Sequence, residues 1–176
     1  YSIMKDMILG LDVSTSITGV TLLDVQGDVL ENFAIDTRKY RNFFDKAEKV
    51  EEAIRSMKKV PSHIFIEQSL QSFRSGFSSA KTLSTLSRFN GVVSWMCFKT
   101  FDIEPEYLAA TSARKAVGIT VPKGTKAKQC VINYVVDSVP DVVIEYTKNG
   151  NPKPQCFDMA DSWVIAKAGW IECQKR

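Results

Sequence analysis

The sequence contains little of the chemistry on which many enzymes depend. Its only histidine is His63, and its four cysteines lie far apart, with no Cys-x-x-Cys pair. A zinc site with cysteine and histidine ligands is therefore not expected, and a histidine-based triad would depend on one residue. Cysteines without a pairing pattern favour a reducing, intracellular setting, such as a bacterial or phage-infected cytoplasm or an organelle.

Long hydrophobic runs are also absent. No segment approaches the roughly 18 apolar residues of a membrane-spanning helix, so we expect no membrane partner. The 176 residues are nevertheless 44% hydrophobic, which is too apolar for an intrinsically disordered chain. We expect one folded domain over residues 1–176, with residues 1–6 as an extension before it, of which residues 1–3 are a candidate cloning remnant.

Acidic residues are missing from two long windows, 68–101 and 107–136, which contain only basic charges. The net charge of +3 does not reveal this uneven distribution. Such windows favour contact with a polyanion, for example nucleic acid. Two helices with solvated basic faces would produce the same pattern, so charge alone leaves both interpretations open.

Hydrophobic periodicity predicts a mixed α/β fold. Three short apolar runs separated by turn residues are typical of a strand meander, and helical patterns then alternate with further strands. We expect strands at 7–13, 18–25, 29–35, 62–68 and 107–110, and helices at 43–57, 83–97, 112–117, 127–136 and 158–172. This order favours a five-stranded sheet, an antiparallel meander followed by parallel strands, with helices on both faces. Asn149-Gly150 predicts a small hairpin.

Four acidic residues stand where a purely structural role explains them poorly. Asp12 and Glu67 each end an apolar strand, and Asp158 and Asp161 lie three residues apart in an apolar helix. If the two strands are neighbours, their carboxylates meet at the carboxyl edge of the sheet, where α/β folds keep their sites. Structural alternatives are a turn residue at 12, an edge-strand charge at 67 and a helix N-cap at 158.

Gathered carboxylates repel one another unless a cation lies among them. Mg²⁺ and Mn²⁺ prefer carboxylate oxygens. Two such ions about 4 Å apart can activate a water and stabilise a leaving oxygen in phosphodiester cleavage. Four acids with almost no histidine therefore favour metal-dependent hydrolysis over a thiol or serine mechanism.

The arrangement resembles a known family. Ile8-Leu9-Gly10-Leu11-Asp12 with Thr18-Gly19, then Phe65-Ile66-Glu67-Gln68, and then Asp158-Met159-Ala160-Asp161 are similar to the motifs of RuvC-like Holliday junction resolvases, in the ribonuclease H-like superfamily. Residues 112–131 also resemble the segment before that family's last helix. The resemblance covers about residues 7–170 and implies a ribonuclease H-like fold.

The resemblance implies a function as well. The enzyme would resolve four-way (Holliday) junctions in DNA by paired symmetric nicks, leaving 5′-phosphate and 3′-hydroxyl ends. The four acids would bind two Mg²⁺ ions per active site, which Mn²⁺ can replace. A homodimer would deliver two sites to the two symmetric strands, with the long helix after Glu67 in the dimer interface.

The resemblance also assigns basic and aromatic residues. Lys128 would lie near the scissile phosphate and stabilise the transition state. Either Arg114 or Lys115 would be a second basic residue of the active site, and the sequence leaves that choice open. Phe73 could stack on a base at the crossover or tuck into the core. The expected DNA contacts are Phe73, Arg74, Arg114, Lys115, Lys123, Lys126 and Lys128.

Three alternatives remain at this point. Another ribonuclease H-like nuclease, acting on flap or branched DNA or on RNA–DNA hybrid, would use the same acids. A non-catalytic junction-binding protein would have no need of all four. The turn at 12–16 also resembles the phosphate loop of actin-like ATPases, but those proteins need two such domains and glycine-rich adenosine loops.

Overall fold

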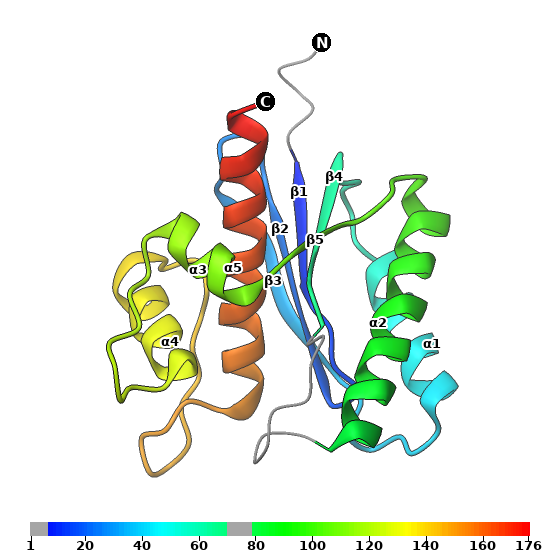
Figure 1. Ribbon diagram of the computed structural model, residues 1–176, viewed down its shortest axis with the longest axis horizontal. Helices are drawn as coiled ribbons and strands as arrows, with labels where there is room; N and C mark the ends of the chain where they lie inside the picture. Colours follow the sequence, from blue (N-terminus) through cyan, green and yellow to red (C-terminus); the bar gives the residue numbers. More distant parts are fainter. Residues whose placement is uncertain (1–6, 70–78) are drawn as a thin grey trace.

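The computed structural model describes residues 7–69 and 79–176. Within these ranges the strands and helices follow the predicted order (Figure 1). They are β1 (Ile8–Asp12), β2 (Ile17–Leu23), β3 (Val29–Asp36), α1 (Phe43–Arg55), β4 (His63–Glu67), α2 (Ala80–Phe101), β5 (Glu106–Leu108), α3 (Ala110–Val117), α4 (Ala127–Ser138) and α5 (Pro154–Gln174).

The five strands form one mixed sheet in the order β3-β2-β1-β4-β5. The meander β1-β2-β3 is antiparallel, whereas β4 runs parallel to β1 and β5 runs parallel to β4. These pairings confirm the predicted mixed sheet. Leu11 pairs with Ile66 in the β1–β4 register. The next residues, Asp12 and Glu67, therefore end neighbouring parallel strands at the same edge.

Helices cover both faces of the sheet, as predicted: α3, α4 and α5 on one face, α1 and α2 on the other (Figure 1). Because side chains alternate along a strand, each of the strands β1 to β4 contributes to two cores. Ile8 and Phe65 pack with α5, whereas Leu9 and Ile64 pack with α1 and α2. By the same alternation, the residues that end β1 and β4 project toward the α5 face.

Helix α5 lies very close to the sheet because glycines line its path. A Cβ at Gly10 would lie 2.5 Å from the Cβ of Ala166. A Cβ at Gly19 would overlap the backbone oxygen of Asp158. Thr21 and Ser162 add a buried hydrogen bond of 2.7 Å between their hydroxyl groups. The first half of α5 is thereby fixed over the carboxyl end of β1.

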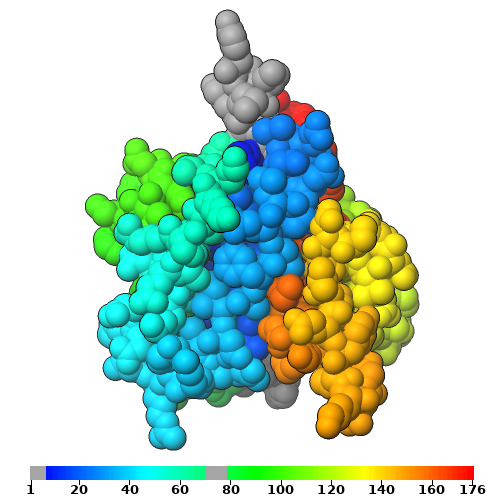
Figure 2. Space-filling view, turned by 180° about the vertical axis from the view of Figure 1, so that it is seen from behind, coloured from blue at the N-terminus to red at the C-terminus, as the bar shows by residue number. Residues whose placement is uncertain are grey.

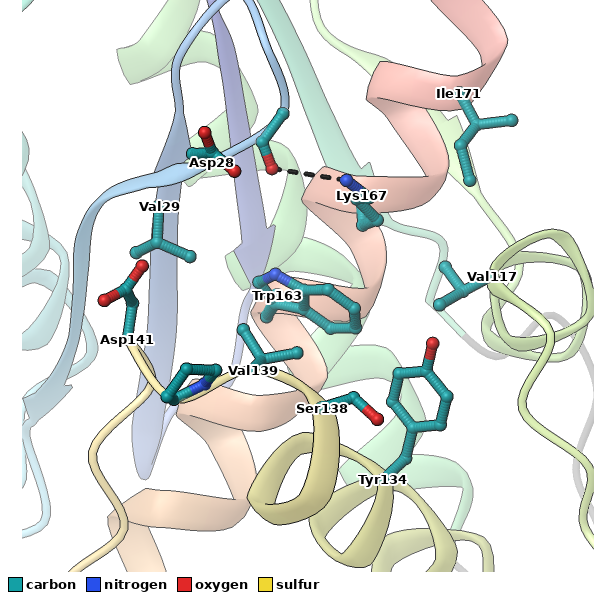
Figure 3. A pocket seen from close by; sticks show the side chains of 12 residues that line it. Asp28, Val29, Val117, Tyr134, Ser138, Val139, Asp141, Trp163, Lys167 and Ile171 are labelled. Atoms are coloured by element: carbon teal, nitrogen blue, oxygen red, sulfur yellow. Dashed lines mark hydrogen bonds between the residues drawn. The ribbon is translucent and has the colours of Figure 1, made fainter.

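The second half of α5 is held by the turn between β2 and β3. Lys167 Nζ donates a hydrogen bond to the carbonyl oxygen of Gly27 at 3.3 Å, and Trp170 Nε1 donates to that of Val25 at 3.1 Å. Lys167 and Trp163 also line a cavity of about 410 Å³ between this turn, α4 and α5 (Figure 3). None of the predicted site residues within 7–69 and 79–176 lines this cavity.

Two of the structural alternatives for the acids are wrong. Helix α5 begins at Pro154, with Lys153 as its N-cap, so Asp158 lies inside the helix and does not cap it. Proline suits the first helical position because no intrahelical partner is needed there for its missing N–H. Strand β4 has neighbours on both sides, so Glu67 is not an edge-strand charge.

The small hairpin before α5 is confirmed. Tyr146 and Pro152 form a bridge, and Gly150 has a positive φ of 82° in the turn between them. All four cysteines are free thiols. Among the described residues, none of the helices has the length and apolar character needed to cross a membrane.

Candidate active site

Four carboxylates gather at the carboxyl edge of the sheet. Asp12 and Glu67 come from the ends of β1 and β4, and Asp158 and Asp161 come from the first half of α5. All four residues are half-buried. Their charges act on one another strongly enough to shift their pKa values. The structure thus brings together the four acids that the sequence analysis selected.

Burial is the main cause of the shifts, and mutual repulsion adds to it. Burial and the charges of the other three acids raise the pKa of Asp12 well above its ordinary value. Burial, Glu67 and Asp158 raise the pKa of Asp161 to about 7. Burial raises the pKa of Asp158 to about 6, and it also raises the pKa of Glu67. The raised pKa values mean that the ionised forms of these four carboxyl groups are destabilised in the folded protein.

Hydrogen bonds from the sheet fix the two aspartates of α5. Asn32 of β3 donates to the carbonyl oxygen of Met159 at 3.0 Å and to the hydroxyl of Thr21 at 2.8 Å. Ser162 also donates to the Met159 oxygen, at 2.8 Å. Met159 lies between Asp158 and Asp161 in the chain. This network therefore anchors the helix turn that carries both carboxylates.

The end of β4 is held from both sides. Asn90 of α2 donates to the backbone oxygen of Glu67 at 3.1 Å, and the next backbone N–H, of Gln68, donates to Leu108 of β5 at 2.8 Å. Asn90 is buried on a helix face whose other buried side chains, apart from Ser94, are apolar. In the helical pattern of residues 83–97 it occupies a core-facing position, in step with Leu86 and Val93. Its amide was the signal for this positioning role.

Two basic side chains act on the carboxylates. Lys128, near the start of α4, has its Nζ 5.3 Å from the ring centroid of Phe157, immediately before Asp158. Its charge lowers the pKa values of Asp12, Asp158 and Asp161. Arg114 of α3 is half-buried, and its charge lowers the pKa values of Glu67 and Asp161.

Of the other predicted DNA contacts, those that the structure describes lie outside this group. Lys115 is exposed on α3, so Arg114 is the one of the two whose charge reaches the acids. Lys123 and Lys126 are exposed on the segment before α4, close in sequence to Lys128. Phe73 and Arg74 lie outside the described residues.

A charged pair near the acids was not foreseen. Arg38 and Asp36, at the end of β3, form an ion pair with a shortest N–O distance of 2.6 Å. Arg38 lowers the pKa of Asp158 and Asp36 raises it. In the sequence the pair looks like an ordinary charged turn after a strand, and only the topology brings it to the site.

The chemistry of the donors fits a hard divalent cation, since every acidic side chain of the group offers carboxylate oxygens. Within the described ranges, however, no three His, Cys, Asp or Glu side chains lie close enough to hold an ion as they stand. Sharing one cation would require these carboxylates to approach one another further. Mutual repulsion opposes this approach until a cation is present.

Comparison with known proteins gives a result at the level of structure. At the level of sequence, no protein-family model matches the chain and no curated protein does so. RuvC of Thermus thermophilus in complex with a Holliday junction substrate superposes with a TM-score of 0.68 at 14% identity, over 97% of this chain and 96% of that one.

Two further structures agree. A second structure of Thermus thermophilus RuvC has a TM-score of 0.61 at 15% identity and covers 96% of each chain. The yeast mitochondrial Holliday junction resolvase Ydc2 has a TM-score of 0.61 at 14% identity, over 97% of this chain and 80% of that one. The ribonuclease H-like fold that the resemblance implied is therefore confirmed.

Proposed function

We propose that this protein is a structure-selective DNA endonuclease that resolves four-way junctions by metal-dependent hydrolysis. The observation that carries the proposal is the meeting of four carboxylates with Lys128 and Arg114 at one edge of the sheet. The fold is shared with a RuvC that was seen with a Holliday junction substrate. The acids supply the chemistry, and the fold suggests the substrate.

In this proposal Asp12, Glu67, Asp158 and Asp161 would hold two Mg²⁺ ions, or Mn²⁺ in their place. Bound ions would supply a water of lowered pKa and charge stabilisation for the leaving oxygen. The chain's own contribution is positional. The two strand ends fix Asp12 and Glu67, while the contacts of α5 with Gly19 and Asn32 fix the two aspartates opposite them.

The basic side chains would act on the substrate. Lys128 and Arg114 lie within electrostatic reach of the carboxylates but belong to separate helices, α4 and α3. A scissile phosphate at the acids would therefore meet a positive charge from each helix. Lys123, Lys126 and Lys115, exposed nearby, would contact the backbone further along the DNA.

The proposal includes a homodimer, because two symmetric strands need two active sites. Helix α2 offers a surface for a second copy. A groove of about 820 Å³ is lined by Phe43, Phe44, Arg88, Gly91, Val92 and Trp95 of α1 and α2. Trp95 is 62% exposed and Phe44 is 66% exposed. Large exposed aromatic side chains are typical of interface anchors.

A cleavage assay tests the proposal. The wild-type protein and Asp12→Asn are incubated with Mg²⁺ and one of four substrates: a four-way junction, a Y-fork, linear duplex or RNA–DNA hybrid. We expect paired symmetric nicks on the junction alone. Asp12→Asn should lose cleavage and keep junction binding, because a neutral amide oxygen holds a divalent cation less tightly than a carboxylate does. Preferred cleavage of the fork or hybrid would identify another ribonuclease H-like nuclease, and full activity of Asp12→Asn would exclude the assigned site.

A further inference from the structure

The topology of the sheet brings a third strand end to the candidate site. Strand β2 is antiparallel to both β1 and β3, so β3 runs in the same direction as β1. The last residue of β3, Asp36, therefore reaches the edge at which Asp12 and Glu67 end. Asp36 pairs with Ile17, two residues before the Gly19 that touches Asp158.

Arg38 is held at this edge in a defined orientation. Its Nε donates to both carboxylate oxygens of Asp36, at 2.9 and 3.1 Å, and its Nη2 donates to Oδ2 at 2.6 Å. Within the described residues, the Nη1 group makes no hydrogen bond. One side of the guanidinium is thus fixed while the other remains available to an anion.

The loop that presents Arg38 is tied to the turn after Asp12. Thr37 is buried, and its N–H donates to the carbonyl oxygen of Ser16 at 2.9 Å. Lys46 of α1 donates to the carbonyl oxygens of Thr15 at 2.6 Å and Thr37 at 3.0 Å. These bonds join the residues after β3 to the residues after β1. Arg38 is therefore displayed by a supported backbone.

An open hollow lies beside this pair. It has a volume of about 590 Å³ and is lined by Asp36, Arg38 and Lys39. In the space-filling view, β2 and β3 (blue) separate the α1 side (cyan) from the side of α4 and the segment before α5 (yellow to orange) (Figure 2). The hollow lies at the end of β3. Its basic side chains therefore come from a different part of the fold than Lys128 of α4 and Arg114 of α3.

We propose that Arg38 and Lys39 form a phosphate-binding subsite for the DNA strand that crosses the carboxylates, separate from the contacts of α3 and α4. This inference rests on the proposed nuclease function and deepens it. Arginine suits the role because its planar group can bind Asp36 and a phosphate along two different edges. The strand would then be held by phosphates on both sides of the cleaved bond.

The first test is the salt dependence of junction binding by fluorescence anisotropy, without divalent cations. Arg38→Gln should flatten the slope of the logarithm of the association constant against the logarithm of the salt concentration by about 0.9, the value for one phosphate contact. Arg38→Lys should restore most of the slope. The matched control is Arg55→Gln, since Arg55 is also exposed and also paired with an acid, Glu51, at 3.4 Å.

The second test locates the phosphate. Junctions with single neutral methylphosphonate linkages are scanned along the strand on both sides of the cleavage site. We expect one or two positions where the neutral linkage weakens binding of the wild-type protein and has no effect on Arg38→Gln. If Arg38 had only a structural role, Arg38→Gln would bind every junction of the scan more weakly by the same factor, wherever the neutral linkage lies.

The outcomes separate this inference from the proposed function. If the wild-type protein nicks junctions but Arg38→Gln keeps the wild-type slope and scan profile, the subsite is wrong and the nuclease assignment stands. If the wild-type protein binds no DNA, the proposed function fails and the subsite fails with it. A change confined to Arg38→Gln, absent from Arg55→Gln, supports the subsite, and the cleavage assay decides the nuclease assignment separately.

Discussion

Gly19 of β2 lies directly against the backbone carbonyl of Asp158 of α5, with no room for a side chain between them. This contact joins the strand that follows Asp12 to the helix that carries two of the four acids. The spacing of the carboxylates therefore depends on a residue that has no chemistry of its own.

Gly19→Ala should disturb the site more than its size suggests. The added methyl must push the first half of α5 away from the sheet, at a cost of about 1–3 kcal/mol in the free energy of unfolding. We expect a lower urea midpoint and a larger loss of cleavage. Gly91→Ala is a control for stability alone, since Gly91 lines the groove of α2; among the described residues, nothing beyond its own stretch of helix backbone lies within 4 Å of an added Cβ. Helix propensity should then raise its free energy of unfolding by up to about 1 kcal/mol, and its urea midpoint with it. Equal midpoints for the two variants would contradict the close contact.

Asp161→Asn should stabilise the protein at neutral pH when divalent cations are absent. The pKa of Asp161 is about 7 in the folded protein, against an ordinary value of 3.8. The folded state therefore binds this proton more tightly than the unfolded state, and stability is lost as pH rises through that window. We expect the melting temperature of the wild-type protein to decrease as the pH is raised from 3.8 to about 7. The melting temperature of Asp161→Asn should decrease less over the same range. Asp137→Asn, an exposed change on α4, is the control and should follow the wild-type curve. A steeper fall for Asp161→Asn would contradict the assigned direction.

Replacing Lys123, Lys126 and Lys128 together by glutamine should weaken junction binding and reduce its dependence on salt. Each lost phosphate contact should flatten the slope by about 0.9. The control is the double change of Lys58 and Lys59, which are exposed in the loop before β4, at the opposite end of that strand from Glu67. An unchanged slope in the triple variant would mean that this basic window is solvated surface.

Trp95→Lys should convert a dimer to a monomer without unfolding the chain. Trp95 is 62% exposed, so a lysine there costs little in the monomer but places a charge in the proposed interface. Sedimentation velocity gives the mass, and circular dichroism checks the fold. Val143→Lys is the matched control, at a residue that is 66% exposed outside that groove. Equal masses for the wild-type protein and Trp95→Lys would exclude this groove as the interface.

The order of strands and helices was predictable because each element is marked by its own local residue pattern. Short apolar runs with turn residues between them mark β1, β2 and β3, and alternation along β1 and β4 places Asp12 and Glu67 on one face. The start of α5 was not predictable in the same way. Its first turn continues a polar, proline-containing segment and has no helical pattern of apolar residues. In the structure this turn packs against the core through Cys156.

The acids of the site were predictable, whereas part of its basic surroundings was not. Asp158 and Asp161 are related by helix spacing, which the sequence contains. Arg38 reaches the site only because β3 returns to the edge at which β1 ends. Choosing Arg114 over Lys115 requires the rotation of a short helix relative to α5, and one residue of error turns the side chain away by about 100°.

The seating of α5 has a consequence for how the protein is made. The helix follows every strand in the chain, yet it covers the centre of one sheet face and brings two of the four carboxylates. During synthesis the strands emerge first, and their α5 face stays open to water until the helix arrives. Until then the nascent chain exposes apolar surface that favours aggregation, and it lacks two of the four carboxylates. The docking of α5 therefore buries this apolar surface and assembles the cluster of acids in one step.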